Sequence, residues 1–167
     1  MIRIVVDDLA FVKADALVRQ TTSFLEATSV SLRRLEHVGG PAFWKQLTTH
    51  GELAVGSAVV TASGDLTADF VIHAVICSPE QPVTLNNVKR ALISALQRAG
   101  DWQLALVAVP PMGTGAGNLE LEDAAAAMVE VLGTALATAT YPQEVCIVVD
   151  DNEQRAVFEG YLKRLPQ

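Results

Sequence analysis

The sequence predicts an α/β fold, a three-layer α/β/α sandwich built around a central mixed, largely parallel sheet. The first observation is that the second half of the chain alternates between helical and strand patterns, with helices at 84–99, 119–137 and 152–164. The second is that the intervening strand patterns, at 104–109 and 145–149, are continuously apolar. Strands of this kind are covered by helices on both faces, and neighbours joined by helical crossovers run parallel.

The first half of the chain contributes shorter elements to the same sheet. Apolar and β-branched runs predict strands at residues 2–6, 15–18, 57–61 and 70–76. Two helical patterns, at about 30–38 and 41–50, meet at Gly39-Gly40-Pro41. The glycines allow a turn there, and proline suits the first position of the next helix.

Length and composition favour one soluble domain that spans residues 1–167. Half of the 167 residues are hydrophobic, which supplies a core and argues against disorder. The net charge of −7 argues against broad contact with nucleic acid, and no apolar run reaches the roughly 18–20 residues that span a membrane. The first residues lack the pattern of a signal peptide, and no metal-binding spacing occurs. We therefore expect a cytoplasmic protein without a metal or other cofactor.

The segment from Val107 to Leu119 carries the main functional signal. It combines a buried strand, the glycine-rich turn Gly113-Thr114-Gly115-Ala116-Gly117 and the start of a helix. Backbone N–H groups in such a turn, with the positive end of a helix dipole, form a pocket suited to a phosphate or diphosphate. The turn lacks the Gly-Lys-Ser/Thr of Walker-type loops and lies too late for a dinucleotide fingerprint. A tight turn without a ligand is the alternative interpretation.

Asp7 and Asp8 follow the first predicted strand. Ligands of parallel sheets bind beyond the carboxyl ends of the strands, so these residues should lie at the same edge as the glycine-rich turn. The carboxylate of Asp8 could accept a hydrogen bond from an exocyclic amine, and a solvated turn is the simpler alternative. His73 lies inside an apolar strand, and we expect it to be a core residue with a satisfied hydrogen bond.

Six segments of the chain carry motifs in a fixed order: Val6-Asp7-Asp8-Leu9, Ala14–Val18, Val38-Gly39-Gly40-Pro41, Val55–Thr61, Phe70–Val75 and Val109–Gly117. Together they resemble a macro domain, the ADP-ribose-binding module, over nearly all of the chain. The first stands where the family has its Gly-Asp-Ile turn. The last is similar to the family's Phe-Pro-Leu-Leu-Gly-Thr-Gly-x-Gly phosphate loop. The resemblance implies the same α/β/α fold.

The resemblance also implies ligand-binding roles. Asp8 matches the aspartate that accepts a hydrogen bond from the adenine amino group, and Leu9 belongs to the same turn. The loop residues Gly113, Thr114, Gly115, Ala116 and Gly117 match the loop whose N–H groups hold the diphosphate. The partner that these matches imply is ADP-ribose or a related small nucleotide.

Three departures from the family pattern bear on function. After the second strand the family has Asn-Ala-Ala-Asn, but this chain has Arg19-Gln20-Thr21-Thr22. The next segment, Phe24–Leu32, lacks the glycines that let a backbone approach phosphates closely. Arg33-Arg34 replaces the small residues that begin the following helix. Two outcomes stay open: the loop has collapsed over the cleft, or Arg19, Arg33 or Arg34 turn inward and form charge-assisted bonds to phosphates.

We favour the hypothesis that the chain binds ADP-ribose or a related adenine nucleotide diphosphate, without efficient catalysis and with a weakened subsite for the distal ribose. A structural or protein-interaction module is one alternative, because the altered loop contains no glycine. A hydrolase of ADP-ribosyl or O-acetyl-ADP-ribose substrates is the other. Glu26 is the only acid in that loop and therefore the one catalytic candidate. The sequence leaves the oligomeric state open.

Overall fold

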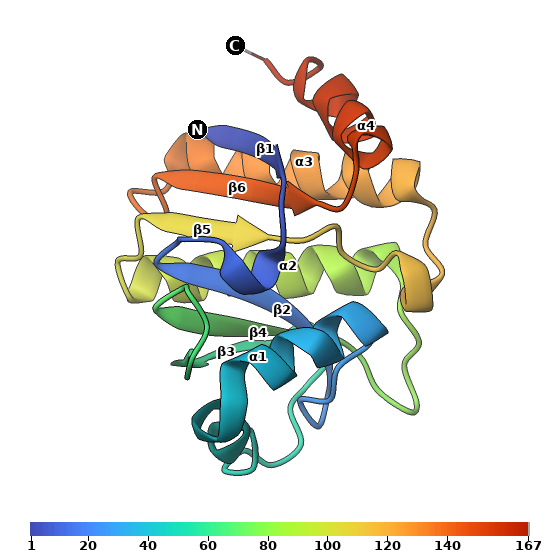
Figure 1. Cartoon of the computed structure of the whole chain (residues 1–167). Coiled ribbons are helices and arrows are strands. Elements are labelled where there is room, and N and C mark those ends of the chain that lie inside the picture. Colours follow the sequence, from blue (N-terminus) through green and yellow to red (C-terminus); the bar gives the residue numbers. More distant parts are fainter. Residues whose placement is uncertain (167) are drawn as a thin grey trace.

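The computed structural model describes residues 1–166, except for the side chain of Ser31. Six strands form one sheet in the order β1-β6-β5-β2-β4-β3 (Figure 1). Neighbouring strands run parallel, except that β3 pairs antiparallel with β4 at one edge. The strands are β1 (Ile2–Val6), β2 (Ala16–Thr22), β3 (Ala58–Ala62), β4 (Phe70–Cys77), β5 (Leu106–Val109) and β6 (Glu144–Val149). The predicted mixed, largely parallel sheet is confirmed.

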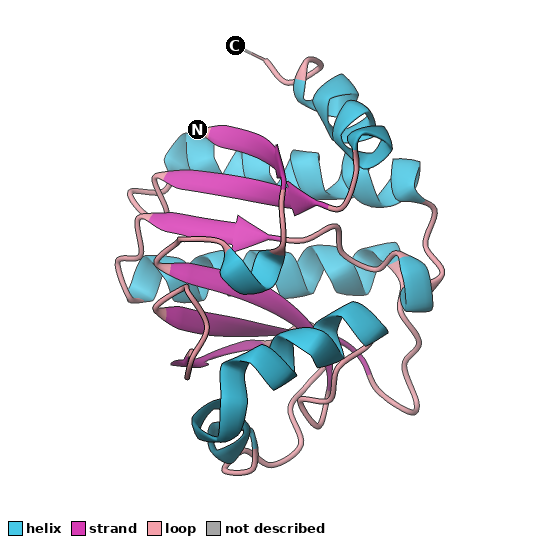
Figure 2. Ribbon diagram, in the orientation of Figure 1, coloured by secondary structure: helices cyan, strands magenta, loops and turns pink. Residues whose placement is uncertain are grey.

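Helices cover both faces of this sheet (Figure 2). The helix α1 lies on one face with the short 3-10 helix η1, whereas α2 and α3 lie side by side on the other. The helix α4 packs against α3, β1 and β6. The helices are η1 (Leu9–Phe11), α1 (Val30–Leu47), α2 (Leu85–Asp101), η2 (Gly115–Gly117), α3 (Leu121–Thr138) and α4 (Asn152–Leu162). This arrangement confirms the three-layer α/β/α fold.

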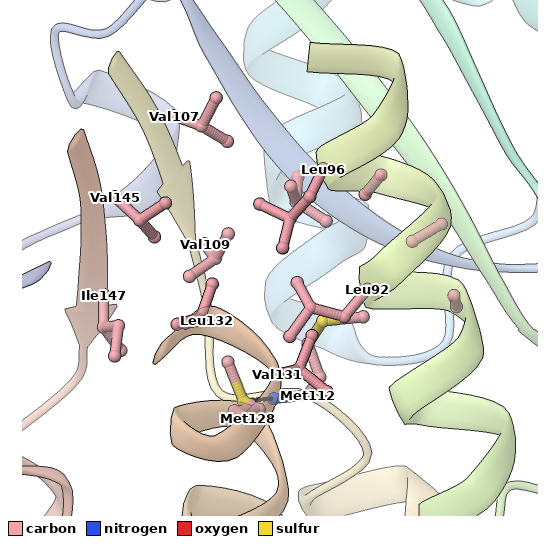
Figure 3. Packing of buried hydrophobic residues seen from close by; sticks show 14 of the residues in the cluster. Leu92, Leu96, Val107, Val109, Met112, Met128, Val131, Leu132, Val145 and Ile147 are labelled. Carbon is pink, nitrogen blue, oxygen red and sulfur yellow. Dashed lines mark hydrogen bonds between the residues drawn. The ribbon is translucent and has the colours of Figure 1, made fainter. Parts of the chain in front are cut away.

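Each face of the sheet has its own apolar core. The larger core joins β5 and β6 to α2 and α3, and its labelled members in Figure 3 include Val109, Ile147, Leu92 and Met128. The smaller core lies under α1 and η1. Because β2 is buried on both faces, successive residues of this strand alternate between the two cores: Leu17 lies in the smaller and Val18 in the larger.

The boundaries of two helices show how local chemistry sets the chain path. The two helical patterns predicted around Gly39-Gly40-Pro41 meet at Gly40, whose φ of +74° is non-helical within the span Val30–Leu47. Asp151 caps α4, because its side chain accepts a hydrogen bond from Gln154 N at 2.9 Å. Among residues 1–166, no helix has the length and apolar character that crossing a membrane would require.

Candidate ligand-binding cleft

A cleft of about 520 Å³ lies at the carboxyl-terminal edge of β1, β6 and β5. It brings together Asp8 and Leu9, which follow β1, with Thr114 and Gly115, which follow β5. Arg34 of α1 lines the same cleft. The structure therefore has an open cleft here, whereas one of the two expected outcomes was a loop that had collapsed over it.

The glycine-rich loop takes a backbone path that side chains resist. Gly113 has a φ of +81° and Gly115 a φ of +65°, both in the left-handed region that favours glycine. A Cβ on Gly113 would lie only 2.5 Å from Leu119 Cδ1, whereas a Cβ on Gly115 would meet no atom within 4 Å. A side chain at position 113 would therefore clash with Leu119, which packs against the loop. A side chain at position 115 would instead occupy open space at the wall of the cleft.

The N–H groups before and after the centre of the loop have partners within the protein. Met112 N–H points to Sδ of Met128 at 3.2 Å, which anchors the loop to α3 (Figure 3). Gly113 N–H donates to Oε1 of Gln20 at 2.7 Å, and Gly117 N–H donates to the carbonyl of Thr114 at 3.3 Å. These bonds hold both ends of the loop in place.

The N–H groups in the centre of the loop differ from those at its ends. Within residues 1–166, the hydrogen bonds of the protein leave the N–H groups of Thr114, Gly115 and Ala116 without an acceptor. Thr114 and Gly115 also line the cleft. Consecutive N–H groups in a left-handed turn form a concave site for anions, so this loop can bind a phosphate oxygen.

Asp8 lies at the other end of the cleft and has two partners in the protein. Its Oδ1 accepts a hydrogen bond from Ala10 N at 3.0 Å, which caps η1, and its Oδ2 accepts one from Nη1 of Arg34. The Arg34 guanidinium also lies 5.6 Å from the centroid of the Phe11 ring, a cation–π distance. Partial burial alone raises the pKa of Asp8, but the two hydrogen bonds and the charge of Arg34 hold it below its usual value.

Arg19 does not line the cleft, contrary to the expectation that it could bind a phosphate. Its side chain is fully buried on the α1 face of the sheet. There it forms an ion pair with Glu36 of α1 and donates to the carbonyl of Leu25 at 3.0 Å. Burial lowers the pKa of Arg19 to about 10, which leaves it a cation at neutral pH. The arginine holds the altered loop and α1 together.

His73 completes this buried polar group as a neutral core residue, as expected. Its Nδ1 lies 3.3 Å from Nη1 of Arg19, and its Nε2 lies 2.8 Å from Oγ1 of Thr61. Because arginine can only donate, Nδ1 accepts, and Nε2–H donates to Thr61. Burial, and then the charges of Arg19 and His50, hold the pKa of His73 well below 6.5.

This neutral histidine predicts that the protein loses stability in mild acid. Below pH 6.5 the unfolded chain binds a proton at His73 and the native protein does not, so unfolding becomes more favourable as the pH falls. The free energy of unfolding should lose about 1.4 kcal/mol from this residue between pH 7.5 and 5.5. Urea denaturation of the wild type and His73→Gln at both pH values measures the difference. Equal pH dependence in the two proteins would refute the assignment.

The remaining predicted site residues are spread around the cleft or lie outside it. Arg33 is exposed on α1, and Glu26 is exposed on the loop before it, and neither lines the cleft. The catalytic candidate is therefore not brought to the candidate site. Gly113 is buried and does not line the cleft, and Ala116 and Gly117 belong to η2 but do not line the cleft either.

Several residues that line the cleft were not singled out as site residues by the sequence. The most informative is Gln20, whose side chain lies between β2 and the glycine-rich loop. It was visible only as a departure from the family's Asn-Ala-Ala-Asn. The others are Val6, Ala10, Ser29, Leu32, Leu35, Pro110, Pro111, Leu121, Val148, Asp150 and Gln154. Most of these side chains are apolar or carry an amide, and such side chains form no chemical pattern that a sequence reveals.

Comparison with known proteins gives one consistent family. A family model described as Macro domain matches residues 22–128. An uncharacterized protein from Aquifex aeolicus is 35% identical over 133 residues, which cover 77% of this chain and 79% of that protein. One from Aeropyrum pernix is 33% identical over 119 residues, but these cover only 63% of its length against 71% of this chain.

Solved structures match the fold along almost the whole chain. The Oceanobacillus iheyensis macrodomain with ADP has a TM-score of 0.85 at 19% identity, covering 97% of this chain and 90% of that one. The Trypanosoma brucei macrodomain in complex with ADP-ribose also has a TM-score of 0.85, at 17% identity, covering 95% of this chain and 68% of that one. Identities this low establish the shared fold alone.

Proposed function

The chain belongs to the macro domain family, and from this premise we propose that its cleft binds ADP-ribose or a related adenine nucleotide diphosphate. The observation that carries the proposal is the row of free N–H groups on Thr114, Gly115 and Ala116. Together with the carboxylate of Asp8 in the same cleft, it offers donors for a diphosphate and an acceptor for an exocyclic amine. Similar proteins have been solved with ADP and with ADP-ribose.

The diphosphate, rather than the distal ribose, should supply most of the affinity. The loop donors form charge-assisted hydrogen bonds, which are stronger than neutral ones. The loop on the other side, which contains Leu25 and Glu26, has no glycine and is fastened by Arg19. We therefore propose that ADP binds nearly as well as ADP-ribose. Because Glu26 does not line the cleft, the proposal includes no efficient catalysis.

Isothermal titration calorimetry with ADP-ribose, ADP and AMP tests this proposal. We expect micromolar binding of ADP and ADP-ribose with similar dissociation constants, and much weaker binding of AMP. Failure of millimolar ADP to produce heat or raise the melting temperature would refute a nucleotide function, because a ligand of the native state must stabilise it.

Replacement of Arg34 should weaken binding of the phosphate end of the ligand and not of the adenine end. The Arg34 side chain is more than half exposed, so it can leave Asp8 when the adenine amino group takes that acceptor. We propose that it then pairs with a ligand phosphate. Arg34→Ala should weaken ADP about fivefold, the upper range of an exposed ion pair, and should leave adenosine no weaker. The same titrations measure both effects, and ADP binding at the wild-type level would exclude Arg34 as a phosphate ligand.

A further inference from the structure

We propose that Gln20 is the positioning residue of the anion-binding loop, and that its side-chain amide replaces a missing stretch of backbone pairing. This inference rests on the proposed function, because the loop that it positions is the one we propose for a diphosphate. The sheet forks between β2 and β5. The strands β2 and β5 pair only at Ala16 with Val107 and at Leu17 with Ala108, although β2 continues to Thr22.

The fork has a cause in the sequence. Beyond β5 the chain continues as Pro110-Pro111, two consecutive residues without an N–H group. A parallel ladder needs such donors, so β5 cannot continue to pair with β2. Gln20 lies on β2 beyond the last paired residue, Leu17, where its own backbone is paired with Ala74 of β4. Its side chain remains to fill the gap.

The Gln20 amide bridges the fork with the polarity of a peptide group. Its Oε1 accepts from Gly113 N–H at 2.7 Å, and its Nε2 donates to the carbonyl of Pro111 at 3.2 Å. Only 8% of the surface of Gln20 is exposed, so water competes little for either bond. A side chain that donates to one residue and accepts from another two positions later fixes the direction of the chain between them.

This bridge sets where the free donors point. Gly113 immediately precedes Thr114, Gly115 and Ala116, and its left-handed φ of +81° starts the turn that carries them. Donors must lie within about 3 Å of a phosphate oxygen to bind it well, so a small rotation at Gly113 moves them out of range. Gln20 thus acts on a phosphate through the loop.

Two variants separate the two halves of the bridge. Gln20→Leu removes both hydrogen bonds, and Gln20→Glu keeps an acceptor for Gly113 but loses the donor to Pro111 whenever it is ionised. We expect Gln20→Leu to weaken ADP about tenfold, the effect of losing two buried neutral hydrogen bonds, with adenosine unchanged. Gln46→Leu is the matched control, because Gln46 also accepts a backbone hydrogen bond, from Ala62 at 2.8 Å, but lies outside the cleft.

The glutamate variant gives a readout that general loss of stability would not produce. When protonated, its carboxyl group can again donate to Pro111, so its deficit in ADP affinity should shrink as the pH falls from 8 to 5. Asp7, Asp8, Asp150 and Arg34 line the same cleft, so the deficit is taken relative to the wild type at each pH. A deficit that stays constant with pH, or one shared by adenosine, would overturn the proposal.

Amide hydrogen exchange of the protein without ligand tests the bridge independently of nucleotide binding. Gly113 N–H should exchange at least tenfold faster in Gln20→Leu, whereas Asn118 N–H, which donates to Gly115 O at 3.0 Å, should keep its rate. Unchanged exchange at Gly113 would refute the bridge. If exchange changes but wild-type protein binds no ADP, the bridge stands and the nucleotide function fails.

Discussion

Replacement of Gly115 by valine should weaken ADP binding roughly a hundredfold while leaving the fold intact. The φ of +65° suits glycine, and a side chain here would enter open space at the wall of the cleft. Both the strain and the bulk prevent a phosphate from reaching the N–H groups of Thr114, Gly115 and Ala116. If only two of these three donors lose their charge-assisted hydrogen bonds, the loss already amounts to about 3 kcal/mol, or roughly a hundredfold in dissociation constant.

Calorimetry and thermal denaturation of the same samples check this expectation. Gly115→Asn separates the two causes, because asparagine tolerates a left-handed backbone but still places a side chain in the cleft. Gly160→Val on α4 is the control, since a Cβ there also meets no atom within 4 Å and the residue does not line the cleft. Wild-type affinity in Gly115→Val would remove the loop from the ligand site.

Replacement of Glu36 by leucine should have the largest effect on stability. Glu36 and Arg19 form an ion pair that is almost completely removed from solvent. Without the carboxylate, the guanidinium remains buried with a charge that no nearby group neutralises. Breaking such a pair costs about 3–5 kcal/mol of unfolding free energy, much of a typical domain's stability.

A double variant distinguishes the charge from the packing. Arg19→Met combined with Glu36→Leu removes both charges and fills the space with apolar atoms, so it should recover most of the stability that Glu36→Leu loses. Urea denaturation of the two single variants and the double variant gives the coupling between the residues. If the double variant is as unstable as the sum of the single ones, the ion pair is not what stabilises this region.

Sequence patterns predicted the sheet and its helices well, because continuous apolar strands and glycine-proline breaks have direct structural consequences. The break at Gly40 is an example. They also indicated the cleft, since Asp8 and the glycine-rich loop each follow a parallel strand. These signals are local, because each depends on only a few neighbouring residues of the chain.

The roles of Arg19 and Gln20 could not be predicted in the same way. The two residues are neighbours on β2, so they must point to opposite faces, but the alternation alone does not say which face carries the cleft. Arginine is the better phosphate ligand in general, which made Arg19 one of three candidates, together with Arg33 and Arg34. The structure places its partner Glu36 on α1 and turns Gln20 toward the glycine-rich loop. Both outcomes depend on contacts between residues far apart in the sequence.

The pair Pro110-Pro111 has a consequence for the energetics of binding. These two residues have no N–H groups with which to pair with β2. The gap between β2 and the glycine-rich loop therefore exists before any ligand arrives. A cleft that had to be opened by breaking a strand ladder would spend part of each ligand's binding energy on that opening. Here the protein's two prolines leave the cleft preorganised, so under the proposed nucleotide function none of the binding energy is spent on breaking a ladder.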